Sequence, residues 1–257
     1  MASDIFLKIM TYPRPLLITG ARGNLGVELV KVFPDSIGVG RGEFDITDKG
    51  EVAAFIEKIK PATVIHAAAL TDVIKCEREQ DLAWRINVIG TENLVEALLT
   101  YAPEAYFVYI STACVFRGDR GDYGEDSMPN PINFYGLTKL LGEFAAKRMK
   151  NNLVIRTNFV PRAPWKHKKV FVDRWGTYLF ADEVAWGIKD VIEKKLTGVV
   201  HVCGSKKMSM FEVAQMVSPD VKPMKLEEFA KTSGVHLTQD ITLRSIRIHP
   251  YKISSHR

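Results

Sequence analysis

The stretch that most limits what this chain can fold into is residues 16–26, which read LLITGARGNLG. A short apolar run ends at Gly20, further glycines follow at Gly23 and Gly26, and a helical pattern then runs over about residues 24–33. A buried strand that turns tightly into a helix presents free backbone N–H groups to an anion such as a pyrophosphate. The spacing is Gly-x-x-Gly-x-x-Gly, and its place on the first strand favours a dinucleotide-binding turn over an ordinary glycine turn.

Strand and helix patterns alternate regularly through the first 157 residues. The expected strands are 16–18, 36–39, 63–69, 106–110 and 153–156, and the expected helices are 24–33, 49–60, 80–100 and 135–150. Asp48 is expected to cap the second helix, and Pro61 to end it. This alternation predicts an α/β fold, a Rossmann-type doubly wound parallel sheet. We expect a dinucleotide-binding domain over residues 1–157 and a small substrate-binding lobe over 158–257, interleaved with the first rather than independent.

Composition narrows the class of protein and its location. The 257 residues can bury one large core, and no apolar run approaches the length of a membrane span. The N-terminal stretch lacks the basic start of a signal peptide and is expected to be a loose leader. Cys76, Cys114 and Cys203 are unrelated in spacing, which fits a reducing compartment, here taken as the cytoplasm, and gives no disulfide framework. We therefore expect neither a metal site nor a membrane partner.

The charge of the chain bears on its ligands. The formal net charge is +5, which mildly favours anionic ligands. The basic run 166–169 is better explained as a solvated loop than as a nucleic-acid contact, so no nucleic-acid partner is expected.

The end of the second strand bears on the choice of cofactor. In this kind of fold an acid at that place binds the ribose 2′-hydroxyl, whereas an arginine accommodates a 2′-phosphate. No acid directly follows Val39, Arg41 is close by, and Arg22 lies inside the glycine loop. These residues favour NADP(H), with NAD(H) as the second choice. The alternative, that both arginines simply face solvent, stays open.

Tyr135 and Lys139 form a Tyr-x-x-x-Lys pair near the start of a helix, so they share one helical face. A nearby ammonium favours the tyrosinate and is expected to lower the phenol pKa from about 10. Such a phenol can protonate a carbonyl oxygen as a hydride reaches the carbon, and Thr112 could hydrogen-bond the same oxygen. A packed tyrosine beside a surface lysine is the alternative. The order of glycine loop, small-residue strand, Asn87, Ser111-Thr112 and the Tyr-Lys pair favours the catalytic interpretation.

With these motifs, the chain resembles the extended short-chain dehydrogenase/reductase family, and within it the branch of the dTDP-4-dehydrorhamnose reductases. The matching stretches lie over about residues 16–158 and are TGARGNLG, FDITD, VIHAAALTDV, INVIGTENL, STACVF, YGED, PINFYGLTKLLGE and IRTN. The resemblance implies hydride transfer from a reduced nicotinamide to the C4 ketone of a nucleotide-linked sugar.

The resemblance also implies site residues. In the catalytic set Tyr135 is the acid, Lys139 its tuner and a ribose ligand, Thr112 the carbonyl partner, and Asn87 a support of the proton relay. The pyrophosphate, adenine and remaining cofactor contacts fall, together with Arg22, Arg41, Tyr135 and Lys139, on Gly20, Gly23, Asn24, Leu25, Gly26, Asp45, Ile46, Ala67, Ala68, Ala69 and Ser111.

Two departures from the family pattern leave the substrate open. Cys114 stands where the family usually has a tyrosine, and residues 158–169 are shorter than the segment that lines the sugar pocket in relatives. The sugar and its nucleotide are therefore undetermined. A nucleotide-sugar epimerase on the same scaffold remains an alternative, whereas a dehydratase is disfavoured because Ala113 and Cys114 occupy the places of its acidic pair. A non-catalytic NADP-binding regulatory subunit, like the partner of methionine adenosyltransferase, and a homodimer also remain possible.

Overall fold

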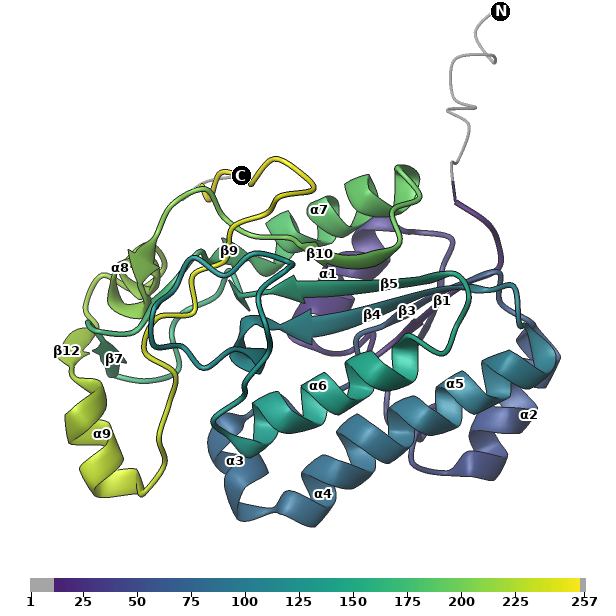
Figure 1. Ribbon diagram of the computed structural model, residues 1–257, viewed down its shortest axis with the longest axis horizontal. Coiled ribbons are helices and arrows are strands. Elements are labelled where there is room, and N and C mark those ends of the chain that lie inside the picture. Colours follow the sequence, from purple (N-terminus) through teal and green to yellow (C-terminus); the bar gives the residue numbers. More distant parts are fainter. Residues whose placement is uncertain (1–11, 255–257) are drawn as a thin grey trace, which may run out of the picture.

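A six-stranded parallel sheet forms the centre of the computed structural model, which describes residues 12–254 (Figure 1). The expected leader lies largely outside the described residues. The strands run in the order β10-β5-β4-β3-β1-β2, which is a doubly wound topology. Their bounds are β1 Leu16–Thr19, β2 Ile37–Val39, β3 Thr63–His66, β4 Tyr106–Thr112, β5 Asn152–Thr157 and β10 Gly198–His201. The predicted fold class is confirmed.

Helices cover both faces of the sheet (Figure 1). Helices α1 (Asn24–Val32) and α7 (Ala181–Glu193) lie on one face, and α2 (Lys49–Ile59), α5 (Gly90–Tyr101) and α6 (Phe134–Ala146) lie on the other. Successive strand residues point to opposite faces, so Leu16 and Ile18 join the first core and Leu17 joins the second. Parallel strands buried on both faces explain the continuous apolar runs of the sequence.

Helix α2 begins and ends close to the residues that the sequence predicts. Asp48 caps the helix through a hydrogen bond in which the Glu51 N–H donates to Asp48 Oδ1 at 2.9 Å. Lys60 then adopts a left-handed conformation and Pro61 follows. These contacts match the prediction from the sequence.

The expected helix over residues 80–100 is interrupted. It consists of α4 (Gln80–Trp84), a π-helical turn at Arg85–Ile89, and α5. A short helix, α3 (Val73–Arg78), precedes it and was not expected. The extra residue of a π turn changes which side chains face inward, and such turns are frequent at functional sites. Asn87 lies in this turn and is only 1% exposed.

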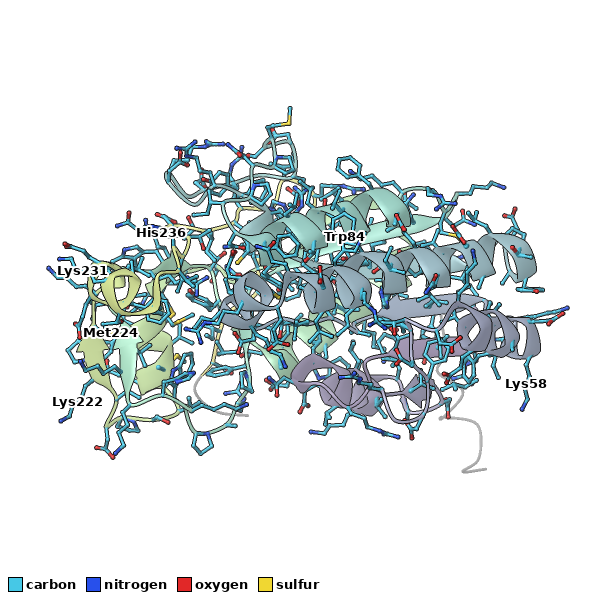
Figure 2. The ribbon with its side chains drawn as sticks, turned by 90° about the horizontal axis from the view of Figure 1, so that it is seen from below. Lys58, Trp84, Lys222, Met224, Lys231 and His236 are labelled. Atoms are coloured by element: carbon cyan, nitrogen blue, oxygen red, sulfur yellow. The ribbon has the colours of Figure 1, made fainter. Side chains whose placement is uncertain are left out.

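The second half of the chain contributes to the main sheet and also builds a small lobe. Strand β10 and helix α7 belong to the Rossmann core, whereas short paired strands and two helices gather at one end of the molecule. Figure 2 shows Lys222, Met224 and Lys231 of this lobe at the end opposite Lys58 of α2. The remaining elements are η2 Ala113–Val115, β6 Phe159–Val160, β7 Lys169–Phe171, β8 Trp175–Gly176, β9 Leu179–Phe180, β11 Met208–Ser209, α8 Met210–Gln215, β12 Lys222–Met224 and α9 Leu226–Ser233.

The last described residues return to the Rossmann core. Tyr123 N–H donates to Thr242 O and Arg244 N–H donates to Tyr123 O, both at 2.9 Å. This segment therefore links the lobe to the loop that precedes α6. None of the helices between residues 12 and 254 has the length and apolar character needed to cross a membrane.

Candidate active site

The glycine loop packs so tightly that it requires glycine at two positions. Gly20 has φ +72°, and a Cβ there would lie 2.6 Å from the backbone nitrogen of Ala68. A Cβ on Gly26 would lie 2.1 Å from Gly20 O, so the helix and the loop touch directly. Gly23 precedes the first residue of α1, and no side chain caps that helix end. The N–H groups of the first turn of α1 thus remain available for a pyrophosphate, and the cradle fits a dinucleotide.

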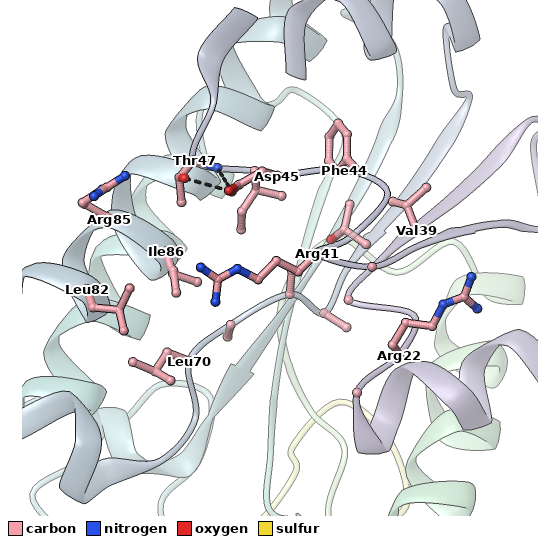
Figure 3. Close-up of a pocket in the computed structure, with 18 residues that line it drawn as sticks. Arg22, Val39, Arg41, Phe44, Asp45, Thr47, Leu70, Leu82, Arg85 and Ile86 are labelled. Atoms are coloured by element: carbon pink, nitrogen blue, oxygen red, sulfur yellow. Dashed lines mark hydrogen bonds between the residues drawn. The ribbon is translucent and has the colours of Figure 1, made fainter. Parts of the chain in front are cut away.

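Two cavities meet at this loop, along the carboxyl ends of the central strands. One encloses about 380 Å³ between β2, the loop after β3 and α4 (Figure 3), and the other about 300 Å³ between α1, β4 and α6. Both are lined by Gly20, Gly23, Ala67 and Ala69, so they form one groove. Ligands of doubly wound sheets bind at this edge.

The structure brings the predicted cofactor residues together around this groove. The first cavity is lined by Gly20, Arg22, Gly23, Arg41, Asp45, Ile46, Ala67, Ala68 and Ala69. The second cavity is lined by Asn24, Leu25, Gly26, Ser111, Tyr135 and Lys139, together with the shared residues Gly20, Gly23, Ala67 and Ala69. The expected adenine end and the expected nicotinamide end are therefore continuous.

Thr112, Tyr135 and Lys139 all line the second cavity. Thr112 ends β4, where its Oγ1 accepts a hydrogen bond from the Cys114 N–H at 3.1 Å. Helix α6 is capped by Asn133, whose Oδ1 accepts from the Gly136 N–H at 2.8 Å. This cap places Tyr135 in the first turn of the helix and Lys139 one turn later, on the same side.

The charges of this trio differ from the prediction. Burial raises the pKa of Tyr135, the nearby Cys114 raises it further, and a hydrogen bond with Thr112 lowers it only in part. Burial also lowers the pKa of Lys139 to about 7, although the Glu143 carboxylate opposes that change. The prediction that the pKa of Tyr135 lies below its ordinary value is therefore wrong: in this protein the pKa is raised. Desolvation disfavours both charged forms and is the largest cause of each shift.

Asn87 is the one predicted catalytic residue that lines neither cavity. Its Oδ1 accepts from the Leu70 N–H at 2.7 Å, and its Nδ2 donates to Leu70 O and to Thr138 Oγ1, each at 3.0 Å. Asn87 thereby joins the loop after β3 to helix α6. In this position it holds the backbone next to the groove, and a part in a proton relay stays a prediction.

Glu143 and Arg156 form a buried ion pair behind the trio that sequence reasoning missed. Arg156 donates from Nε and Nη2 to the two oxygens of Glu143, at 2.8 and 2.7 Å, and Ser111 Oγ donates to the same carboxylate at 2.6 Å. Glu143 is four residues after Lys139 and eight after Tyr135, so the helical spacing already placed it on their face. Ser111 is thus fixed toward this pair while it lines the groove.

A second buried arginine, Arg174, acts on Tyr135 through its charge. Arg174 is 8% exposed, donates from Nε to Thr238 O at 3.2 Å, and places Nη2 3.8 Å from the Sγ of Cys114. Its charge lowers the pKa of Tyr135. A cation therefore occupies the neighbourhood of the residue that departs from the family pattern.

Comparison with known proteins matches this geometry to a family. The model of the RmlD substrate binding domain matches residues 14–236. The chain belongs to the RmlD substrate binding domain family. Its parallel sheet and flanking helices match solved members. The dTDP-4-dehydrorhamnose reductase of Bacillus anthracis in complex with NADP has a TM-score of 0.81 and 30% identity, with 89% of each chain covered. The reductase ortholog of Clostridium acetobutylicum has a TM-score of 0.80 and 32% identity, again covering 89% of each.

Curated relatives of this chain carry two different names. The dTDP-4-dehydrorhamnose reductase of Aggregatibacter actinomycetemcomitans is 29% identical over 83% of this chain and 81% of that protein. The methionine adenosyltransferase 2 subunit beta of Xenopus laevis is 31% identical over 78% of this chain and 70% of that protein. Both an enzyme and a subunit of another enzyme are thus similar to this chain.

Proposed function

We propose that the protein is an NADP(H)-dependent reductase of the C4 ketone of a nucleotide-linked 4-keto-6-deoxy sugar. The observation that carries this proposal is the continuity of the groove, in which Thr112, Tyr135 and Lys139 share one cavity with the glycine loop. Relatives named as reductases support the substrate class. NADPH, when bound, supplies the hydride.

The protein's own residues supply and hold the proton. The Tyr135 hydroxyl is protonated at neutral pH, since the ordinary phenol pKa of about 10 is raised further by burial, and it can donate to the carbonyl oxygen. Thr112, which hydrogen-bonds the same phenol, orients it. Lys139 changes its protonation near pH 7, so it can return a proton to the tyrosinate. The ketone thus gains a hydride and a proton to become an alcohol.

The test is NADPH oxidation with a dTDP-4-keto-6-deoxy sugar, followed by NADPH absorbance. Tyr135→Phe should lower kcat by about 10²- to 10⁴-fold, the usual contribution of general acid catalysis, while the Kd for NADPH stays unchanged. Tyr101→Phe, at the end of α5 and outside the groove, is the matched control. A Tyr135→Phe variant as active as the wild type would refute the proposal.

A non-catalytic regulatory subunit is the second candidate. The similarity to methionine adenosyltransferase 2 subunit beta favours it. It predicts NADPH binding without turnover of any keto-sugar, together with a stable stoichiometric complex with a methionine adenosyltransferase. An epimerase, the third alternative, would isomerise a nucleotide sugar without net consumption of NADPH.

The proposal extends to partners and location. We expect a nucleotide sugar as the small-molecule partner, a cytoplasmic location, no nucleic-acid partner and a possible homodimer. The three cysteines are free and buried, in keeping with a reducing compartment. Light scattering on the purified protein measures the oligomeric state.

A further inference from the structure

The end of β2 carries an ion pair that the proposed reaction does not use. Arg22 Nη2 donates to Glu43 Oε1 at 2.5 Å, and the Gly40 N–H donates to Glu43 Oε2 at 2.9 Å. The hydrogen bond from Gly40, followed by that from Arg22, lowers the pKa of Glu43. The carboxylate is therefore charged at neutral pH and held from two sides.

The backbone is shaped to let this pair form. A Cβ on Gly40 would lie 2.5 Å from Cγ of Arg22, so the arginine stem crosses the strand end where a side chain is missing. The crossing carries the guanidinium from the glycine loop to Glu43. The pair thus lies at the strand end that meets the adenosine ribose in this type of fold.

The two arginines of this cavity differ in their partners. Arg22 is bound to Glu43, whereas Arg41 has no carboxylate in hydrogen-bonding or ion-pair contact among residues 12–254. Figure 3 shows Arg41 extending into the cavity toward Ile86, whereas the guanidinium of Arg22 points in the opposite direction. Asp45, whose pKa is lowered chiefly by hydrogen bonds from Thr47, also feels the charge of Arg41, but only Arg22 is held by a direct ion pair with a carboxylate of this strand end.

We propose that Glu43 is a cofactor-specificity residue that keeps NAD(H) competitive with NADP(H) by holding Arg22 from a 2′-phosphate. An acid at this place accepts a ribose 2′-hydroxyl and repels a 2′-phosphate, whereas a guanidinium does the reverse. Glu43 is not among the residues that line the cavity, but its carboxylate adds a negative charge beside it and occupies the Nη2 donor of Arg22, which does line it. The inference rests on the proposed function only in that a dinucleotide binds the groove.

The first experiment measures Kd for NADPH and for NADH by calorimetry, without any sugar, at low ionic strength. Glu43→Gln keeps the side-chain size and an acceptor for Gly40, and should raise the ratio Kd(NADH)/Kd(NADPH) on the order of tenfold. Glu96→Gln is the matched control, because Glu96 of α5 forms an exposed ion pair of 2.8 Å with Lys49 of α2. A ratio that changes less than twofold, or as much as in the control, overturns the proposal.

The second experiment tests the part played by Arg22. In an Arg22→Gln background, Glu43→Gln should raise the ratio by less than half of its effect in the wild type. An undiminished effect overturns the claim that Glu43 acts by holding Arg22. If the wild type binds neither dinucleotide, the proposed function and this inference both fail. If both dinucleotides bind and only the ratio is insensitive, the inference alone fails.

Discussion

Replacing Glu143 with glutamine should destabilise the protein strongly, because it leaves the Arg156 guanidinium buried without a counter-charge. The two side chains are 0% and 3% exposed, and they share two hydrogen bonds of 2.8 and 2.7 Å. Arg156 Nη1 already has no hydrogen-bond partner, so the carboxylate is its chief compensation.

The magnitude follows from the burial of the pair. Removing one partner of a buried ion pair costs about 3–5 kcal/mol, and we expect the lower end, about 3 kcal/mol, because glutamine keeps one acceptor oxygen. For a chain of this size about 1 kcal/mol shifts Tm by about 2–4 °C, so the expected fall is about 6–12 °C. The charge of Glu143 also supports the Lys139 ammonium, so the variant should lower the pKa of Lys139 below about 7.

Urea unfolding and calorimetry measure the change in the free energy of unfolding and in Tm. The exposed pair variant Glu96→Gln should cost less than about 1 kcal/mol, because exposed pairs contribute little. The double variant Glu143→Leu/Arg156→Met removes both charges and should cost less than Glu143→Gln alone. A loss below about 1 kcal/mol for Glu143→Gln would show that water or a relaxed backbone solvates Arg156, and the reasoning would fail.

Two further predictions concern the first turn of α1 and the end of β3. Gly26→Ala should weaken NADPH binding at least about tenfold and lower the free energy of unfolding by about 1–3 kcal/mol, because its methyl would lie 2.1 Å from Gly20 O. Kd measurements and urea unfolding check both effects. Gly42→Ala is the control, because a Cβ at Gly42 would have nothing within 4 Å. Burial lowers the pKa of His66 to about 3, so below pH 6.5 the unfolded chain binds a proton that the folded protein does not. Stability present at pH 7 should therefore fall by about 2 kcal/mol at pH 5 in urea unfolding, and a His66→Asn variant with the same pH dependence would contradict this.

The contacts of His66 can all be satisfied by a neutral ring. Its Nδ1 lies 2.6 Å from Thr19 Oγ1 and its Nε2 lies 3.0 Å from Thr91 Oγ1. Thr91 Oγ1 donates its hydrogen to Asn87 O, so it accepts from Nε2, and Nδ1 accepts from Thr19. A neutral ring satisfies this chain of bonds, whereas protonation would place a charge in a buried site.

The sequence was sufficient for the sheet because its signals are local. Each buried parallel strand reads as a short apolar run, and Asp48 caps α2 with a side chain three residues from its donor. The π turn was beyond this kind of reasoning. Within it Asn87 contacts Thr138, 51 residues later in the chain, and no local pattern encodes that contact.

The candidate site divides in the same way. The glycine loop and the Tyr-x-x-x-Lys pair lie within single turns, so spacing alone placed them. Glu43 was overlooked because its partner Arg22 lies 21 residues earlier, on a different element. No acid directly follows Val39 in the sequence, but the backbone turns back after β2, so the Glu43 carboxylate accepts a hydrogen bond from the Gly40 N–H.

The electrostatics of the trio show why spacing alone cannot predict its chemistry. Spacing four apart on a helix brings an ammonium near a phenol, and in water this would favour the tyrosinate. Here both groups are buried, so desolvation raises the pKa of Tyr135 and lowers that of Lys139. A phenol that holds its proton is a donor, which suits reduction of a ketone. Oxidation of the alcohol would need the tyrosinate as a base, so we expect that reaction to require a higher pH than ketone reduction.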